Sequence, residues 1–209
     1  MRTMSWGPRG RSVLETYEVS IIVTTVPACL PPDAMTLPVT IRLATPNDAA
    51  AMAAVEVAAA QRFRAIGMPH IADAEATDAA AVRVRIDAGR AYVALDAHGT
   101  CAGFAFYRLL DAQRLYLEEL DVAPSHAGQR IGARLVETVA ERAAADRVGE
   151  IVLSTFRTPP WNAPYYRCLG FDDIDDAALD DALRAIRAYH LSLGLDETQR
   201  VFMRRAVRA

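Results

Sequence analysis

The stretch Ser125-His-Ala-Gly-Gln-Arg-Ile-Gly-Ala-Arg134 decides the fold of this chain. It follows a strand-like run, residues 115–122, and the breaker pair Ala123-Pro124, and it leads into a run with helical apolar periodicity. A helix that begins at a glycine-bearing turn presents backbone N–H groups without intrahelical partners, and its dipole adds partial positive charge there. Because glycine lets a bulky group approach the backbone closely, we expect this turn to bind the phosphates of a ligand.

Two common phosphate-binding patterns do not fit this turn. A dinucleotide site needs Gly-x-Gly-x-x-Gly early in a strand–helix–strand unit, and a nucleotide P-loop ends in Gly-Lys followed by Ser or Thr. The chain contains no lysine, because all 23 of its basic residues are arginine. The phosphate ligand is therefore expected to be of another kind.

Three segments resemble the GNAT superfamily of acyl-CoA-dependent N-acetyltransferases. Residues 117–124, Leu-Glu-Glu-Leu-Asp-Val-Ala-Pro, are similar to its fourth strand, and residues 161–171, Trp-Asn-Ala-Pro-Tyr-Tyr-Arg-Cys-Leu-Gly-Phe, are similar to a later helix. The turn between them is similar to the family's pyrophosphate loop, Arg/Gln-x-x-Gly-x-Gly/Ala. Gly132 keeps the last position of that loop, whereas Ala127 and Arg130 depart from the other two.

The resemblance covers residues 39–205 and implies a fold. The expected fold is a mixed α/β (α+β) domain with a twisted, mainly antiparallel central sheet flanked by helices. This sheet splays where the strand at residues 115–122 separates from the next, parallel strand. Residues 1–38 are rich in Gly and Pro without helical periodicity, so we expect a disordered extension followed by an N-acetyltransferase domain over residues 39–209.

The resemblance also implies an activity, the transfer of an acetyl group from acetyl-CoA to a primary amine by direct attack in a ternary complex. Acetyl-CoA is then a co-substrate, no metal is needed, and the acceptor is a small-molecule amine or a peptide. Two alternatives stay open: a CoA-binding or sensory module without catalysis, which the departures in the loop motivate, or the transfer of another acyl group. The residues implied to bind the CoA portion are Leu120, Asp121, Val122, Ala127, Gly128, Gln129, Arg130, Ile131, Gly132, Ala133, Asn162 and Tyr165.

Three residues are candidates for the proton transfers. By the resemblance, the hydroxyl of Tyr166 protonates the leaving thiolate of CoA. Glu118 and Glu119 are candidates for the base that takes a proton from the acceptor amine. Strand alternation places Glu118 on the same side as Leu120 and Val122, which favours Glu118, although a bulge would reverse the choice. The alternative for Glu118 is a surface ion pair with Arg108 or Arg114.

Four further features each have a functional and a structural interpretation. Asn162 is either a CoA contact or a helix N-cap, and it lies closer to Tyr166 than is usual in the family. His70 is a candidate for the acceptor wall, and His126 for a phosphate contact, but either can simply be exposed to solvent. The acidic run at residues 172–181 either attracts a cationic amine or favours the first turn of the following helix.

Composition limits the partners and the compartment. The net charge of −3 gives no reason to expect nucleic-acid binding. Three widely spaced cysteines indicate reduced thiols in a cytoplasmic protein and show no metal-ligand spacing. No apolar run approaches the ~20 residues of a membrane helix, so no membrane contact is expected. Abundant alanine, with arginine in place of lysine, indicates a GC-rich bacterial genome, and a homodimer is an assembly that we keep open.

The patterns of apolar residues and breakers predict the order of elements. Strands are expected at residues 39–44, 90–95, 102–109, 115–122, 151–156, near 171, and at 200–204. Helices are expected at residues 49–63, 76–88, 131–145, after 161, and at 177–193. Residues 68–71 are expected to form a loop.

Overall fold

The computed structural model describes residues 38–207 of the 209-residue chain. Our expectation of a disordered extension concerns residues of which all but Pro38 lie outside the described part. The described strands are β1 (Thr40–Leu43), β2 (Ala91–Leu95), β3 (Cys101–Leu109), β4 (Arg114–Val122), β5 (Glu150–Phe156), β6 (Asp172–Asp173) and β7 (Arg200–Ala206). The described α-helices are α1 (Ala49–Ala60), α2 (Pro69–Ala72), α3 (Ala79–Asp87), α4 (Ile131–Ala145), α5 (Ala163–Cys168) and α6 (Asp181–Ser192).

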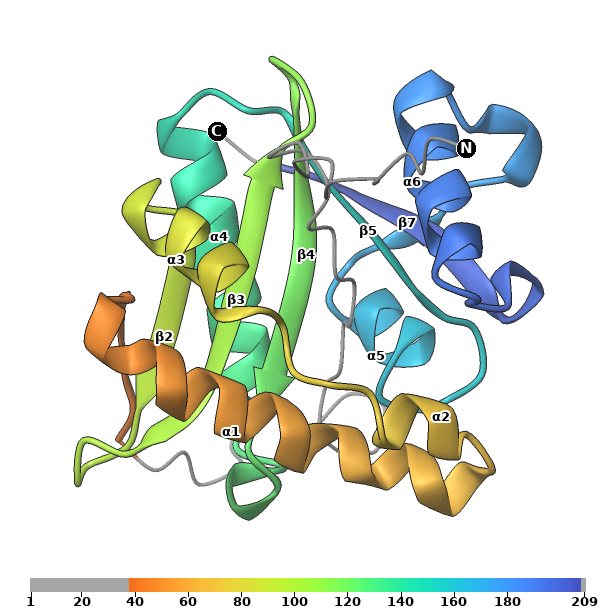
Figure 1. Ribbon diagram of the computed structural model, residues 1–209. Coiled ribbons are helices and arrows are strands. Elements are labelled where there is room, and N and C mark those ends of the chain that lie inside the picture. Colours follow the sequence, from red (N-terminus) through yellow and green to blue (C-terminus); the bar gives the residue numbers. More distant parts are fainter. Residues whose placement is uncertain (1–37, 208–209) are drawn as a thin grey trace, which may run out of the picture.

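The strands form one sheet in the order β1-β2-β3-β4-β5-β7-β6. Its pairs are antiparallel except for β4 and β5, which pair in parallel. These two strands are in register only from Arg114 opposite Glu150 to Tyr116 opposite Val152. Beyond that point β4 runs on to Val122 and β5 to Phe156 without pairing with each other, so the sheet splays between them (Figure 1). The mixed, mainly antiparallel fold and the splay at this strand pair are therefore confirmed.

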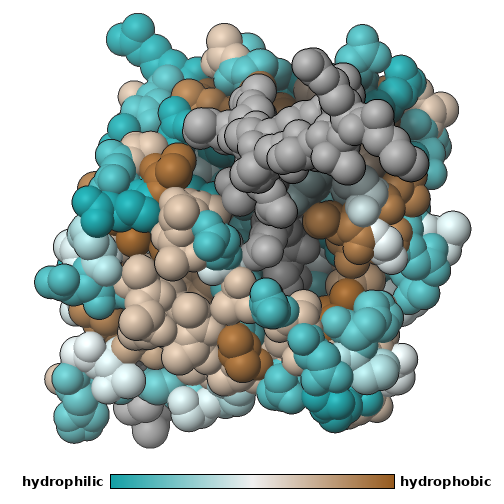
Figure 2. All heavy atoms as spheres, in the orientation of Figure 1, coloured by the Kyte–Doolittle hydropathy of each residue, from teal (hydrophilic) through white to brown (hydrophobic). Residues whose placement is uncertain are grey.

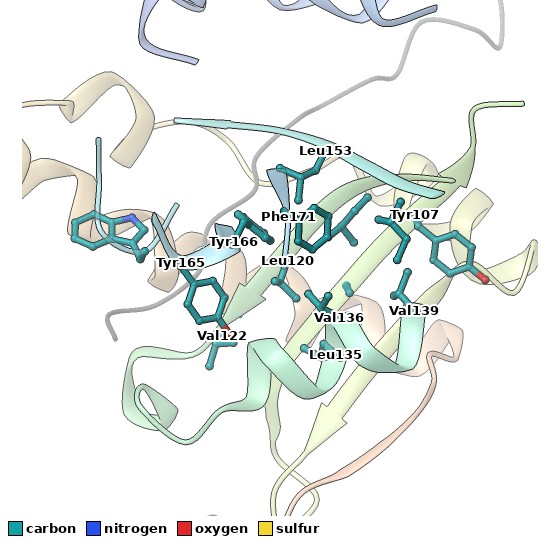
Figure 3. Close-up of a cluster of buried hydrophobic side chains, with 14 of the residues drawn as sticks. Tyr107, Leu120, Val122, Leu135, Val136, Val139, Leu153, Tyr165, Tyr166 and Phe171 are labelled. Atoms are coloured by element: carbon teal, nitrogen blue, oxygen red, sulfur yellow. The ribbon is translucent and has the colours of Figure 1, made fainter. Parts of the chain in front are cut away.

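Helices cover both faces of the sheet (Figure 1). On one face α4 packs its apolar stripe, including Leu135, Val136 and Val139, into a buried cluster with Leu120 and Val122 of β4. Figure 3 shows these two β4 side chains on the α4 side of the sheet. On the opposite face α1 and α3 cover β2 to β4, and α6 covers the region of β5 and β7 through separate buried clusters. The two faces of β4 therefore meet different helices.

Local sequence explains where most helices begin and end. The side chains of Asp78 and Asp180 accept hydrogen bonds from the first turns of α3 and α6, as expected for N-cap residues. The first helix ends through a 3₁₀ segment at Gly67, whose φ of 78° is left-handed. Most exposed positions of α1 are alanines, so the surface over this helix is mainly pale brown in Figure 2.

Two expectations about the elements are wrong. Residues 68–71 do not form a simple loop, because Pro69 at the first helical position starts the short helix α2. The helix expected from residue 177 begins only at Asp181, because Asp175 caps a separate 3₁₀ turn before it. The later part of the acidic run thus lies at the start of α6, as its structural interpretation predicted, while Asp173 pairs with Arg167.

The cysteines and the lengths of the helices bear on the predicted cellular compartment. Cys101 and Cys168 are free thiols, and Cys29 lies outside the described residues. Within residues 38–207, none of the helices combines the length and the apolar character that crossing a membrane requires.

Candidate active site

A β-bulge in β4 decides where its two adjacent glutamates point. Phe106 of β3 pairs with Glu119, but the next residue, Tyr107, pairs with Leu117, so Glu118 is the extra residue on β4. The bulge interrupts the alternation, and Leu117 and Leu120 both join the cluster on the α4 face. The alternation argument that placed Glu118 with Leu120 and Val122 is therefore wrong, because the two glutamates contact groups of the opposite face.

Glu118 lies in a buried ion-pair network. Its carboxylate is 2.9 Å from Nε of Arg85 on α3 and 3.2 Å from Nε of Arg108 on β3. The Glu118 side chain is 4% exposed and that of Arg85 is 10% exposed. A pairing with Arg108 was one of the structural alternatives, but the pair is buried instead of lying on the surface. Two guanidinium groups compensate the charge of this glutamate, as a buried carboxylate requires.

Glu119 lies instead among other carboxyl groups. Its Oε2 atom is 3.1 Å from the hydroxyl oxygen of Thr77, and the same hydroxyl oxygen is 3.0 Å from Oε1 of Glu56 on α1. Burial, and then the carboxyls of Glu56 and Asp121, raise the pKa of Glu119 well above its usual value. Burial and Glu56 likewise raise the pKa of Asp121. Glu119 and Asp121 are two residues apart on β4 and are 1% and 0% exposed.

The Thr77 hydroxyl gives an independent reason for a proton in this cluster. A hydroxyl has one hydrogen, so it can donate to only one of the two carboxyl groups. The backbone N–H of Thr77 also donates to Oε1 of Glu56, at 2.9 Å, which favours Glu56 as the charged acceptor. The same hydroxyl lies 3.1 Å from Oε2 of Glu119, so one hydroxyl is within hydrogen-bond distance of two buried carboxyl groups.

Two adjacent tyrosines of α5, Tyr165 and Tyr166, are buried in one cluster with their ring centres 5.8 Å apart. Tyr166 is fully buried, and its hydroxyl has no hydrogen-bond partner among the described residues. Burial raises the pKa of Tyr166 well above its usual value, Tyr165 and Asp121 add to this effect, and Arg62 opposes it. A phenol with a raised pKa stays protonated near neutral pH and can donate its proton. Figure 3 shows Tyr166 near Phe171, and Tyr165 near Val122.

The turn before α4 has the geometry of an anion site. Gly128 has a φ of 78°, and Arg130, the N-cap residue of α4, is left-handed with a φ of 57°. The first hydrogen bond that closes on this cap runs from the N–H of Arg134 to the carbonyl of Arg130, so earlier N–H groups have no such helical partner. Burial raises the pKa of Tyr165, and Arg130 and a hydrogen bond with the Ala133 backbone oppose this rise. The predicted residues Arg130, Ala133 and Tyr165 therefore lie together.

Three further candidates, Asn162, His70 and His126, each had a functional and a structural interpretation. Asn162 occupies the N-cap position of α5, but its side chain makes no capping hydrogen bond; its Nδ2 atom donates to the Thr155 hydroxyl at 2.8 Å. His70 is exposed on α2. His126 lies 3.4 Å from the carboxylate of Asp96, which holds the end of the loop against the β2–β3 turn.

Glu56, Arg62 and Thr77 were not predicted as site residues from the sequence. Glu56 is the one charged residue of α1, whose sequence is otherwise apolar, and it is buried. A single charge in an apolar helix was therefore an available signal, because charged groups are seldom buried without a partner. Arg62 follows α1, and its guanidinium carbon lies 5.1 Å from the centre of the Trp161 ring. Thr77 carried no signal, since its role depends on two segments distant in sequence.

The chain matches the model of a known protein family. The model of the acetyltransferase (GNAT) family matches residues 61–171, which include β4, the turn before α4, and α5. The chain belongs to the GNAT acetyltransferase family. The resemblance that its three segments showed is therefore confirmed, and the acyltransferase fold with it.

Solved structures support the same fold at low sequence identity. N-acetylglutamate synthase from Neisseria gonorrhoeae, in complex with coenzyme A and N-acetyl-glutamate, has a TM-score of 0.63 and 17% identity over 84% of this chain. The GNAT chain spans only 37% of that protein. A GNAT acetyltransferase from Staphylococcus aureus has a TM-score of 0.63 and 14% identity, over 82% of this chain and 100% of its own.

A further neighbour is the PaiA N-acetyltransferase from Thermoplasma acidophilum, in complex with coenzyme A, with a TM-score of 0.61 and 16% identity. The match covers 81% of this chain and 99% of that protein. At these identities the neighbours show the fold alone.

Proposed function

We propose that this GNAT domain transfers an acetyl group from acetyl-CoA to a primary amine by direct attack in a ternary complex. The observation that carries the proposal is the pairing of a buried, unpartnered Tyr166 hydroxyl with a buried carboxyl cluster beside the splay of β4 and β5. Amide formation needs a group that takes a proton from nitrogen and a group that gives one to sulfur. Both kinds of group are present here, since the Tyr166 hydroxyl is close enough to Asp121 of the cluster to interact with it electrostatically.

The acetyl-CoA fits the residues of the turn and the adjoining strand. Gly128 and the left-handed Arg130 direct the N–H groups at the start of α4 toward an anion, and the helix dipole favours a pyrophosphate there. The guanidinium of Arg130 can add a charge-assisted hydrogen bond that a glycine lacks. Beyond Tyr116, β4 does not pair with β5, and we propose that the pantetheine arm lies along β4 near Leu120.

We assign the base to Glu119 and not to Glu118. The carboxylate of Glu118 is held by Arg85 and Arg108, and accepting a proton would weaken both ion pairs. The carboxyl of Glu119 has no arginine within ion-pair distance among the described residues, and its raised pKa suits a group that accepts a proton from an amine. Tyr166 then protonates the leaving thiolate. The acceptor is a small-molecule amine or peptide, and the reaction takes place in the cytoplasm.

The first experiment is binding of acetyl-CoA followed by turnover. Saturation at 100 times the dissociation constant should stabilise the fold by about 2.7 kcal/mol, measured as a thermal shift. Gly132→Val should weaken this shift by placing a branched side chain at the start of α4. A panel of amines, aminoglycosides, amino acids and peptides, with detection of free thiol, then identifies the acceptor. Lack of any shift with millimolar acetyl-CoA or CoA would contradict the proposal.

A second candidate function, a CoA-binding module without catalysis, is favoured by the departures at Ala127 and Arg130. The two candidates differ in the effect of Tyr166→Phe, which removes only a hydroxyl from a packed ring. In an enzyme this change lowers turnover and leaves CoA affinity near that of the unchanged protein, while Tyr165→Phe has little effect on turnover. A protein that binds CoA tightly but acetylates none of the amines would support the binding module.

A further inference from the structure

In the Glu56–Thr77–Glu119 contact, a single hydroxyl lies between two buried carboxyl groups. The three residues come from α1, from the segment before α3 and from β4, and all three are buried. The Thr77 hydroxyl oxygen is 3.0 Å from Glu56 and 3.1 Å from Glu119, both within hydrogen-bond distance. A bridge of this kind can hold one proton and move it without exposing a charge to solvent.

We propose that Thr77 joins Glu56 and Glu119 into one proton-sharing unit, which frees the Glu119 carboxylate to act as the base. This inference rests on the proposed function and deepens it. Before the shift, the Glu119 carboxyl donates to the Thr77 oxygen, and the Thr77 hydroxyl donates to the Glu56 carboxylate. In the shift, the Glu119 proton passes to the Thr77 oxygen while the Thr77 proton passes to Glu56. The hydroxyl is restored, Glu119 is ionised, Glu56 is protonated, and no proton is gained or lost.

The chemistry of the acceptor explains the use of such a unit. When the amine nitrogen attacks the thioester carbonyl, the new C–N bond leaves an excess proton on nitrogen. The ionised Glu119 takes this proton, the C–S bond breaks, and the thiolate takes a proton from Tyr166. A Glu119 that is already protonated cannot do this, and losing its proton to solvent from a buried site is costly. Transfer to Glu56 over two hydrogen bonds avoids that step.

Charged groups from each surrounding element act on this unit. Glu56 faces Glu119 from α1, Asp121 faces it from its own strand, and Arg62 faces Asp121 from the segment after α1. On α3, Arg85 is held by Glu118. Thr77 and Glu56 act through Glu119 and not on the thioester, so they are positioning residues. Their test therefore needs a pH profile, which a merely structural role would not shift.

Thr77→Val is the sharpest test, because it removes the hydroxyl and keeps the shape and the backbone N–H to Glu56. With an amine that the unchanged protein acetylates, the alkaline-rising limb of kcat should move to higher pH. Turnover near neutral pH should then fall about tenfold or more, as expected for a limb moved by about one pKa unit, and should converge with that of the unchanged protein in alkali. Thr77→Ser restores the hydroxyl and should restore the profile. CoA binding, measured by thermal shift, should be unaltered in both variants.

Glu56→Gln is a second variant, which should shift the pH profile in the opposite direction. It removes the charge that opposes ionisation of Glu119, so the limb should move to lower pH. Asp48→Asn, at the ion pair with Arg42 before α1, is a control that should leave the profile unshifted. Profiles unshifted in Glu56→Gln, or in a folded Thr77→Val, overturn the proton-sharing unit. If the unchanged protein acetylates none of the amines, the proposed function itself fails.

Discussion

Two buried polar clusters of this protein have opposite charge arrangements. Around Glu197, between α6 and β7, one carboxylate meets His190 at 2.6 Å and both Arg187 and Arg200 at 3.4 Å. Around Glu119, in contrast, three carboxyl groups lie together, and two of them have raised pKa values. Opposite charges lie together in the first cluster, whereas burial, and then the neighbouring carboxyls, disfavour ionisation in the second. Strongly perturbed pKa values of this kind are typical of functional sites.

The strongest test of this contrast is Glu119→Gln, which keeps the shape and removes the base. Turnover should fall about 10²–10⁴-fold near neutral pH. The loss should shrink as the pH rises, because more of the acceptor then arrives deprotonated. The measurement is a pH–rate profile with thermal-shift binding of CoA as the folding control. A Glu119→Gln variant with the profile of the unchanged protein would remove Glu119 from the mechanism.

Substitution of the adjacent Glu118 should change the stability of the protein and not its turnover rate. Glu118→Gln leaves Arg85 and Arg108 without their buried carboxylate, so it should lower the free energy of unfolding by about 3 kcal/mol. Urea unfolding measures this loss, and kcat of the remaining folded protein should change little. If Glu118→Gln instead lowers kcat with unchanged stability, the assignments of the two glutamates are reversed.

The two clusters should change the pH dependence of the free energy of unfolding in opposite directions. Burial lowers the pKa of His190, so the stability it contributes is present above its unfolded pKa of about 6.5 and is lost as the pH falls. The raised pKa of Asp121 acts the other way, and its contribution is lost as the pH rises. His190→Asn should flatten the curve below about pH 6.5, and Asp121→Asn should flatten it as the pH rises above the unfolded Asp pKa of about 3.9. Two unchanged curves would show that neither group is coupled to folding.

The smallest expected effect separates strain from binding in the turn before α4. Arg130 is left-handed, so Arg130→Gly should raise the free energy of unfolding by about 1 kcal/mol while weakening CoA binding. Arg147, exposed after α4 with a φ of 59°, is the matched control. Arg147→Gly should raise stability similarly and leave CoA binding unchanged. Equal CoA affinity in both variants would show that Arg130 does not contact the phosphates.

The sequence was sufficient for most elements because their signals are local. The helical periodicity after residue 131 and the breakers around residues 96–100 depend on neighbouring residues, so α4 and the β2–β3 hairpin were predicted within a residue or two. The short helix α2 was missed because a single turn carries too little periodicity to recognise. For the candidate site, the sequence named Tyr166, both glutamates and the turn, but it favoured Glu118, which the structure pairs with two arginines.

The sequence by itself determined the family, the fold class and the position of the glycine-bearing turn before α4, because each depends on residue types at short spacing. Only the tertiary structure decided the surroundings of the two adjacent glutamates. A single extra residue in β4 turned Glu118 toward two arginines and left Glu119 with Thr77 and Glu56. Strand alternation cannot predict a bulge, and α1 lies more than fifty residues before β4 in the chain. The proton affinity of a carboxyl depends on the charges around it in space, and folding alone brings those charges together.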